Sequence, residues 1–159
     1  MLVAVVSDTH GLLRPELLHE LEARGPFDRI FHAGDVGNPE ILDALRTLAP
    51  VTAIRGNVDQ FGPCAELPAA EALELDGCLI YMLRALEDLD LNPRAAQICV
   101  VISGHSHQPS ITQREGVLYL NPGRADLRRF QLPITFAILR IAGAKPTAQI
   151  IDLETRTEN

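Results

Sequence analysis

The amino-acid sequence predicts an α/β fold whose first half alternates strands and helices and whose second half is mostly strand. The N-terminal run Leu2–Val6 is continuously apolar, as in a central parallel strand buried on both faces. Leucines at positions 17, 18 and 21 then follow the spacing of a helix. Farther on, Asp76-Gly77 and Glu115-Gly116 stand between β-rich runs, where hairpin turns are expected. The 159 residues show no repeat, low-complexity stretch or linker, which favours a single domain over 1–159.

In chain order, the first half is expected to form strand, helix, strand, helix, strand. The first helix covers about residues 14–24, with Pro15 in its first turn and Gly25-Pro26 ending it. The second helix begins after Asn38, whose side chain suits an N-cap before Pro39. The three strands are Leu2–Val6, Arg29–Ala33 and Val51–Ile54. This β-α-β-α-β order implies parallel strands joined by right-handed crossovers.

The second half is expected to hold two hairpins and three further strands. The hairpin strands and one buried strand are expected at Glu71–Leu75, Cys78–Leu83, Ile98–Ile102, Ser110–Arg114 and Val117–Leu120. Two C-terminal strands follow at Ile134–Ile141 and Thr147–Leu153. We also expect a loop at Phe61–Leu67, a short helix near Pro93–Gln97, and a frayed tail at Thr155–Asn159.

Composition narrows the class of protein. The chain is 47% hydrophobic and 22% charged, which is typical of a globular protein that buries a core. Its net charge of −7 and the lack of a basic stripe argue against stable binding of nucleic acid. No apolar run approaches the roughly 18–20 residues of a membrane helix, and the start of the chain lacks the basic region of a signal peptide. Three widely spaced cysteines, Cys64, Cys78 and Cys99, are typical of free thiols, so we expect a cytoplasmic protein.

Polar side chains of types that bind metals follow four of the predicted strands. They are Asp8 and His10 after the first strand, Asp35 after the second, Asn57 after the third, and His105 and His107 after the strand ending at Ile102. Taken singly, the carboxylates and the amide fit N-caps or turns equally well. The last two histidines are harder to explain by packing, and they could aim at one point or at two neighbouring points. Because ligands bind open α/β sheets at the carboxyl ends of strands, the set predicts a metal site assembled from distant segments.

The chemistry of this donor set limits the metal. Mixed carboxylate, imidazole and amide ligands suit a transition metal better than the all-oxygen cages of Mg²⁺ or Ca²⁺. We expect Mn²⁺, with Fe, Zn²⁺ and Ni²⁺ as alternatives, and one or two ions per chain. Asp35 lies centrally in the order of ligands and could bridge two ions. His19, on the first helix, is expected to be structural, and His32 to orient a neighbour rather than bind metal.

Four motifs in this order, Asp8-x-His10, Gly34-Asp35, Gly56-Asn57 and Gly104-His105-x-His107, resemble those of the calcineurin-like metallophosphoesterases. The chain length and the run Leu118–Gly123 are similar to the small bacterial and archaeal phosphodiesterase branch, to which the metallophosphoesterase-like subunit of retromer is related. The resemblance implies a four-layer αββα sandwich, in which two mixed β-sheets are flanked by helices. It also implies a hydrolase that cleaves a small phosphodiester with metal-activated water, using two ions about 3.5–4 Å apart.

The resemblance also assigns roles to single residues. Asp8, His10, Asp35 and His107 match the ligands of the first metal, Asp35 bridges to the second, and Asn57 and His105 match ligands of the second. No catalytic residue beyond these ligands is assigned. The family expects one more histidine at the end of the strand Cys78–Leu83, where this chain has Arg84. A guanidinium has no lone pair to donate, so we expect a weakened second site, and Arg84 could contact the substrate phosphate instead.

Two functions stay open on this basis. The first is a phosphodiesterase with an impaired or remodelled second metal site, and the second is an inactive relative that serves as a binding or scaffold protein. The basic cluster Arg124, Arg128 and Arg129 could lie near the metals or form a solvated surface loop. The apolar residues Phe130, Leu132 and Ile134 could form a subunit contact, as in a homo-oligomer, or belong to the core.

Overall fold

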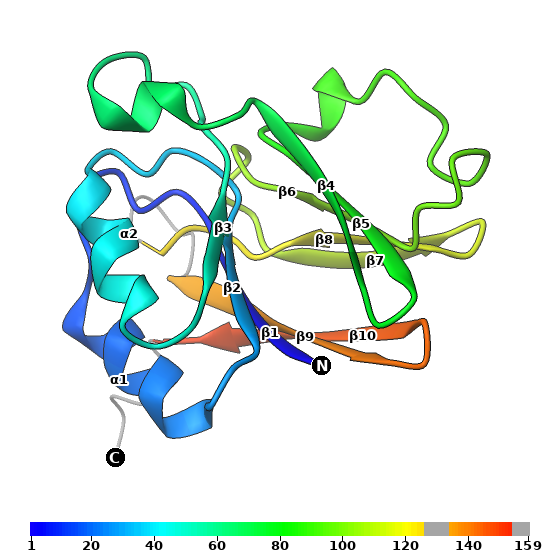
Figure 1. Cartoon of the computed structure of the whole chain (residues 1–159), viewed down its shortest axis with the longest axis horizontal. Helices are drawn as coiled ribbons and strands as arrows, with labels where there is room; N and C mark the ends of the chain where they lie inside the picture. Colours follow the sequence, from blue (N-terminus) through cyan, green and yellow to red (C-terminus); the bar gives the residue numbers. More distant parts are fainter. Residues whose placement is uncertain (126–133, 154–159) are drawn as a thin grey trace.

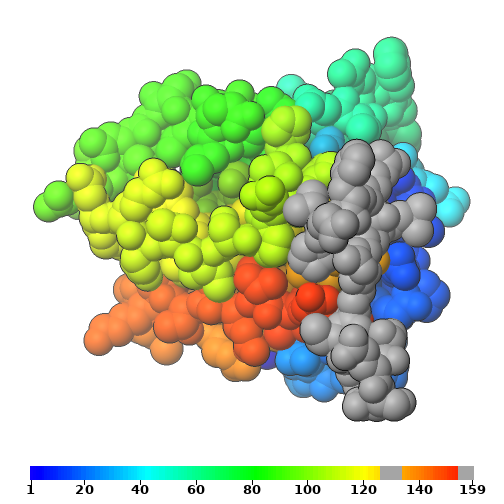
Figure 2. Space-filling model, turned by 180° about the vertical axis from the view of Figure 1, so that it is seen from behind, coloured from blue at the N-terminus to red at the C-terminus, as the bar shows by residue number. Residues whose placement is uncertain are grey.

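The computed structural model, which describes residues 1–125 and 134–153, consists of two mixed five-stranded sheets packed face to face (Figure 1). The first sheet has the order β10-β9-β1-β2-β3, made of β1 (Leu2–Val6), β2 (Arg29–His32), β3 (Val51–Ala53), β9 (Thr135–Ala142) and β10 (Lys145–Asp152). The second has the order β4-β5-β6-β8-β7, made of β4 (Ala70–Leu75), β5 (Cys78–Leu83), β6 (Val100–Ser103), β7 (Ser110–Arg114) and β8 (Val117–Asn121). Seen from behind in Figure 2, the orange and red strands β9 and β10 lie beneath the green and yellow segments of the second sheet. The predicted sandwich is confirmed.

Side chains of β1 alternate between two separate cores, which explains why the whole strand is apolar. Val3 and Val5 pack between the sheets with residues of β5, β6 and β8, whereas Ala4 and Val6 face the helices. Helices α1 (Pro15–Arg24) and α2 (Pro39–Arg46) cover this outer face of the first sheet (Figure 1). The outer face of the second sheet packs instead against Leu86 and Leu89, in and beside the short 3-10 helix η2 (Leu86–Asp88).

The residue at which helix α2 begins is set by local side-chain chemistry. Asn38 accepts a hydrogen bond from the Glu40 backbone N–H at 2.9 Å, and Pro39 occupies the first helical position, as expected. Helix α1 has Pro15 at its start but no side-chain cap at Arg14. Because the helices connect strands that run parallel, the carboxyl ends of β1, β2 and β3 lie at one edge of their sheet.

The second sheet adds three more parallel strands. Strand β5 pairs parallel with β6, and β6 pairs parallel with β8, while β4 and β7 are antiparallel at the edges. The loop after β6 meets the loop after β1, since the His105 backbone N–H donates to Asp8 Oδ2 at 3.3 Å. The carboxyl ends of strands from both sheets therefore face one region of the molecule.

The predicted helix near Pro93–Gln97 is wrong. The structure has successive turns there, with the Ala96 N–H donating to the Asn92 carbonyl at 3.0 Å and the Ile98 N–H to the Pro93 carbonyl at 2.9 Å. Gln97 adopts a left-handed backbone with φ of 61°, which stops a helix before it completes a second turn. A smaller difference is a 3-10 helix, η1 (Pro63–Glu66), inside the stretch expected to be loop.

Several expectations fall on residues outside the described ranges: Arg128, Arg129, Phe130, Leu132 and the tail Thr155–Asn159. Ile134 is described, and it is buried in the core beneath the helices. No helix within residues 1–125 and 134–153 has the length and apolar character needed to cross a membrane.

Candidate metal centre

The loops that follow β1 and β2 are joined by backbone hydrogen bonds, which places their polar side chains together. The N–H groups of Asp8, His10 and Gly11 donate to the carbonyls of Gly34, Asp35 and Val36, at 3.0, 2.9 and 2.8 Å. These bonds extend the pairing of the two parallel strands beyond their ends. Asp8 and His10 are thereby held directly beside Asp35.

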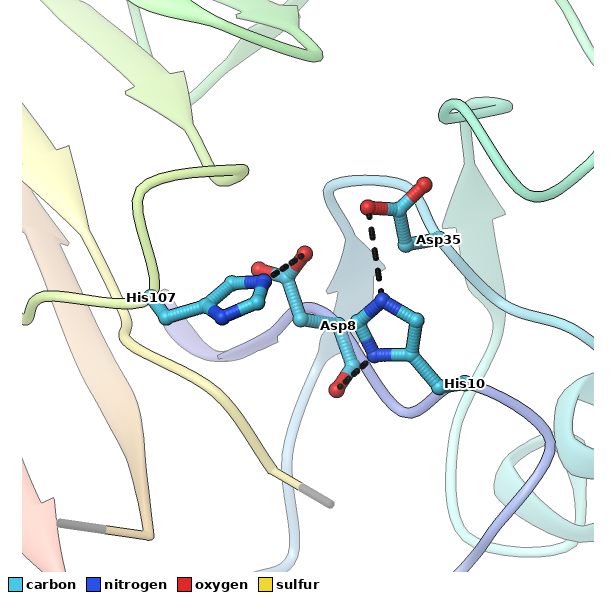
Figure 3. A group of neighbouring side chains, drawn as sticks. All are labelled: Asp8, His10, Asp35 and His107. Atoms are coloured by element: carbon cyan, nitrogen blue, oxygen red, sulfur yellow. Dashed lines mark hydrogen bonds and ion pairs between the residues drawn. The ribbon is translucent and has the colours of Figure 1, made fainter. Parts of the chain in front are cut away.

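Four of the six predicted ligands form one compact cluster (Figure 3). One donor atom from each of Asp8, His10, Asp35 and His107 lies within 4.8 Å of the others. Figure 3 shows the four side chains pointing toward a common centre from the ends of β1 and β2 and from the loop beyond β6. The pairs His10 Nε2–Asp35 Oδ2 and His107 Nε2–Asp8 Oδ1 are 3.6 and 3.5 Å apart.

The hydrogen bonds of Asp8 leave one carboxylate oxygen for a ligand. Its Oδ2 accepts from Ser7 Oγ at 2.5 Å and from the His105 backbone N–H at 3.3 Å. Its Oδ1 is buried and has no hydrogen-bond partner within the described part of the chain. Burial acts to raise the pKa of Asp8, but the nearby His107 imidazole and the hydrogen bond from Ser7 outweigh it and hold this pKa below its usual value. Asp8 is therefore charged at neutral pH, with Oδ1 turned toward the cluster.

Hydrogen bonds also orient Asp35 and His10, so that one polar atom of each faces the cluster. Asp35 Oδ1 accepts from the Val58 N–H at 3.1 Å, which leaves Oδ2 toward His10. Burial, and then the neighbouring Asp8 carboxylate, raise the pKa of Asp35. His10 Nδ1 lies 3.1 Å from the Asp8 backbone carbonyl, which can only accept, so the ring proton is on Nδ1 and the lone pair is on Nε2. Asp35 Oδ2 and His10 Nε2 therefore face each other within the cluster, 3.6 Å apart.

The backbone is strained at the same residues. Asp8, His10, Asp35, His105 and His107 all have positive φ, between 50° and 71°. Such a conformation costs about 1–2 kcal/mol for each residue with a Cβ, and clusters of it typically mark functional sites. The kinked loop sends His107 to the cluster, whereas His105 points elsewhere.

Two glycines allow the loops to approach one another. A Cβ on Gly56 would collide with the Asp35 side chain and its backbone nitrogen. A Cβ on Gly104 would collide with Ser7 Oγ, which holds the Asp8 carboxylate. The glycines of the Gly-Asn and Gly-His motifs are thus required by contact with the two carboxylates.

The cluster fits a divalent cation. Two buried carboxylates and two imidazoles supply four donors with two negative charges. The buried Asp8 Oδ1 accepts no hydrogen bond within the described residues, and a bound cation would compensate for that. Nitrogen and oxygen donors in this mixture suit a divalent transition metal. The arrangement can hold one such ion.

Comparison with known proteins agrees with this geometry. Residues 1–144 match the family model described as the calcineurin-like phosphoesterase superfamily domain. The chain belongs to this superfamily. A probable metallophosphoesterase from Methanothermobacter thermautotrophicus is 36% identical over 164 residues, covering 95% of this chain and 92% of the relative.

Solved structures of similar fold come from bacteria and eukaryotes. Wild-type Vps29 from Entamoeba histolytica, solved with Zn²⁺, has a TM-score of 0.75 at 22% identity and covers 97% of this chain and 100% of its own. A predicted phosphoesterase from Streptococcus pneumoniae has a TM-score of 0.74 at 22% identity, covering 96% of this chain and 90% of its own. At these identities the likeness establishes the fold, and the resemblance seen in the motifs is confirmed.

The two remaining predicted ligands of this metallophosphoesterase-family chain lie outside the cluster of four. His105 Nδ1 accepts from Arg84 Nη1 at 3.2 Å, and Arg84 Nη2 donates to Asp88 at 2.8 Å. Asn57 is exposed, and with Arg84 it lines an open hollow of about 360 Å³ between the loops after β3 and β5. Arg84 thus stands at the end of β5, in contact with one of the histidines assigned to the second metal.

Residues that the motif pattern did not single out hold the ligand loops in place. Asp59 is 1% exposed, and its carboxylate accepts from the N–H groups of Val36 and Gly56 through Oδ2, at 3.0 and 2.9 Å, and of Gly37 through Oδ1, at 2.8 Å. It therefore ties the Asp35 loop to the Asn57 loop. In the sequence, Asp59 lies two residues after Asn57, but aspartates in turns are so common that this position alone does not reveal its role.

His32 orients a neighbour, as expected, and His19 is exposed on α1. His32 Nδ1 accepts from the Gly34 N–H at 3.2 Å, so its Nε2 carries the proton and donates to Thr9 Oγ1 at 3.0 Å. The Thr9 hydroxyl in turn donates to the Val36 carbonyl at 2.9 Å. This chain fixes the backbone between Asp8 and His10.

We predict that Asp59→Asn lowers the free energy of unfolding by about 3 kcal/mol. The carboxylate now accepts hydrogen bonds from three backbone N–H groups, and the NH₂ group of an asparagine would face one or more of these donors without being able to accept. Chemical denaturation of the metal-free protein measures the change. The matched control is Asp43→Asn, at an exposed position on α2 where a loss below about 0.5 kcal/mol is expected. Equal effects of the two substitutions would contradict the assignment of Asp59.

We predict that His32 makes folding sensitive to acid. Burial lowers the pKa of His32 from 6.5 to about 4. Between these values the unfolded chain takes up a proton that the folded chain does not, so stability is full above pH 6.5 and falls as the pH drops toward 4, by up to about 3 kcal/mol.

The measurement is chemical denaturation of metal-free protein across this pH range. His32→Asn keeps an acceptor for the Gly34 N–H but cannot ionise, so its stability should fall less steeply with acid than that of the wild type. His19→Asn, which removes an exposed imidazole, is the control. A His32→Asn protein with the wild-type slope would refute the prediction.

Proposed function

We propose that this protein is a metal-dependent phosphodiesterase whose single well-formed ion site is made by Asp8, His10, Asp35 and His107. The observation that carries the proposal is the convergence of these four donors within 4.8 Å, around a buried Asp8 Oδ1 without a hydrogen bond. The archaeal relative, a probable metallophosphoesterase at 36% identity, supports the class of reaction. We expect Mn²⁺ as the ion, with Fe, Zn²⁺ or Ni²⁺ as alternatives.

The residues divide the work around the ion. When bound, a divalent ion activates water and stabilises charge on the phosphoryl oxygens. Asp8 and Asp35 would hold it with the oxygens that face the cluster, while Ser7 and the Val58 N–H keep the carboxylates from turning. His10 would bind through Nε2, because its Nδ1–H is held by the Asp8 carbonyl. The ligands are thus oriented before the ion binds, which limits the entropy lost on binding.

The second ion site is proposed to be weakened by Arg84. Its guanidinium donates to His105, one of the expected ligands, and carries a fixed positive charge into the place of a second ion. The same charge suits a phosphoryl oxygen of a substrate lying in the hollow lined by Arg84 and Asn57. A phosphodiester carries one negative charge, which one ion and one guanidinium can balance.

The alternative is a binding or scaffold protein that keeps the fold without turnover. The Arg84–His105 contact favours it, because this contact competes with ligation of a second ion. A cytoplasmic location is proposed in either case, since Cys64, Cys78 and Cys99 are free thiols.

The test of activity is hydrolysis of bis(p-nitrophenyl) phosphate with Mn²⁺ added to chelator-treated protein. We expect metal-dependent release of p-nitrophenol, and a loss of about 100-fold in kcat/KM for Asp35→Asn, which removes one ligand charge. Asp43→Asn should retain wild-type activity. No turnover with any of the four metals, together with less than one bound ion per chain after dialysis, would favour the scaffold.

The test of Arg84 is restoration of the imidazole. Arg84→His should raise the metal content from about one to about two ions per chain and increase turnover several-fold, because a ligand replaces a cation. Arg55→His changes another arginine that lines the same hollow and should alter neither quantity. If Arg84→His leaves metal content at the wild-type value, Arg84 is not the cause of a weak second site.

A further inference from the structure

A hollow of about 190 Å³ lies on the outer face of the second sheet, beside the loop of residues 104–107. Hydroxyl groups predominate in its lining, and they belong to Ser103, Ser106, Ser110, Thr112 and Tyr119. Thr112 of β7 pairs with Tyr119 of β8, whose ring packs on the outer side of the sheet, so Thr112 points to that side as well. Because a hydroxyl can both donate and accept, this hydroxyl-lined hollow suits a ligand that carries several hydroxyls itself.

The hydroxyl of Ser106 has its proton left for a ligand. Asn121 Nδ2 donates to the Gly104 carbonyl at 3.2 Å and to Ser106 Oγ at 2.9 Å, while Asn121 Oδ1 accepts from the Gly123 N–H at 2.9 Å. Ser106 Oγ also accepts from the Gln108 N–H at 3.3 Å. These two bonds use the lone pairs of Ser106 Oγ, so this group can serve a further partner only as a donor.

Two contacts place the hydroxyl-lined hollow directly beside the candidate metal centre. Gly104 lines the hollow, and a Cβ on Gly104 would lie only 3.0 Å from Asp8 Oδ2. Glu87 also lines the hollow, and its Oε1 lies 4.0 Å from His105 Nε2. The other ring nitrogen of His105 accepts from Arg84, the residue that we propose to contact the substrate phosphate.

Neighbouring residues of the short helix η2 line two different hollows. Glu87 lines the hydroxyl-lined hollow, whereas Asp88 lines the larger hollow of about 360 Å³ together with Arg84. Arg84 donates to Asp88 on one side and to His105 on the other. A phosphoryl group at Arg84 would therefore have one hollow on each side. This arrangement matches a phosphodiester, which carries two alcohol groups on one phosphorus.

We propose that the hydroxyl-lined hollow is a substrate subsite, which binds a polyhydroxylated alcohol group of the phosphodiester, such as a single sugar. This inference deepens the proposed function and rests on it. Ser106 donates to an oxygen of the sugar, Thr112 exchanges a hydrogen bond with a second hydroxyl, and Glu87 accepts from a third. The other alcohol group of the diester lies in the larger hollow. An alcohol without hydroxyls forms none of these bonds and is a poorer substrate.

The first test compares two diesters that release the same p-nitrophenol. In one, the second alcohol is methyl glucoside joined through O6, and in the other it is tetrahydropyran-2-methanol, which has the same ring without the hydroxyls. We expect kcat/KM of the wild type to be about 10-fold higher for the glucoside diester, since each net hydrogen bond contributes about 1 kcal/mol. A ratio near one would overturn the proposal.

Variants of Thr112 test whether the preference arises in this hollow. Thr112→Val keeps the shape of the side chain and removes the hydroxyl, so it should lower the ratio of the two kcat/KM values about 5-fold. Thr112→Ser keeps the hydroxyl and should retain the ratio. Thr147→Val, at an exposed position on β10, is the matched control and should also retain it. A wild-type ratio in Thr112→Val would exclude the hydroxyl-lined hollow as the subsite.

The second test reads binding without turnover. ¹H–¹⁵N spectra of the protein supplied with Zn²⁺ are recorded during titration with glucose 6-phosphate, and again with the phosphate ester of tetrahydropyran-2-methanol. The backbone amides of Ser110 and Thr112 should shift with glucose 6-phosphate only. Equal shifts with both compounds, or none with either, would contradict a site for a polyhydroxylated group.

The outcomes separate this inference from the proposed function. If diesters are cleaved without preference and the amides of β7 do not shift, the enzyme stands and the subsite does not. If no diester is cleaved but glucose 6-phosphate alone shifts these amides, the proposed enzyme fails and the hollow stands as a site for a polyhydroxylated phosphate ester. If neither cleavage nor shifts occur, both proposals fail.

Discussion

Two carboxylates, those of Asp8 and Asp35, are buried side by side where the two sheets meet, and much of the surrounding structure compensates for their charge. A buried carboxylate is costly unless hydrogen bonds or a cation balance it. Here Ser7, the His105 N–H and the Val58 N–H hold one oxygen of each carboxylate, and the other oxygens face two imidazoles. This arrangement favours the binding of a cation. Without a cation, the two buried negative charges lower the stability of the fold.

The direction of the strands in the sandwich brings the residues of this centre together. Six strands, three in each sheet, are parallel to their neighbours, and the loops beyond them carry the polar residues of the site. The first sheet supplies Asp8, His10 and Asp35, and the second supplies His107 with the arginines that follow β5 and β8. Neither sheet alone holds a complete set of ligands, so the packing of the two sheets is a condition for the site.

The loops that carry the polar residues have a strained backbone, which lowers the stability of the fold. Five of the polar residues have left-handed backbones, and the nearby glycines admit no side chain. Asp59 and the His32–Thr9 pair offset this strain with hydrogen bonds among the loops. Two arginines, Arg84 and Arg124, each donate to Nδ1 of one histidine of the Gly-His-Ser-His loop.

The sequence by itself predicted most of the strands and helices, because apolar periodicity is a local property, and its motifs pointed to the family and to the four residues that cluster at the candidate metal centre. It failed where the outcome depends on distant atoms. The stretch 93–97 became turns, and Asp59 looked like any aspartate in a turn until its three N–H partners were placed around it.

Only the tertiary structure decided that His105 and His107 point to different places, that Arg124 is buried rather than solvated, and that Asp8 keeps one oxygen without a hydrogen bond. The physical reason is that the direction of a side chain in a loop depends on backbone angles and partners contributed by other strands, and no local pattern records them.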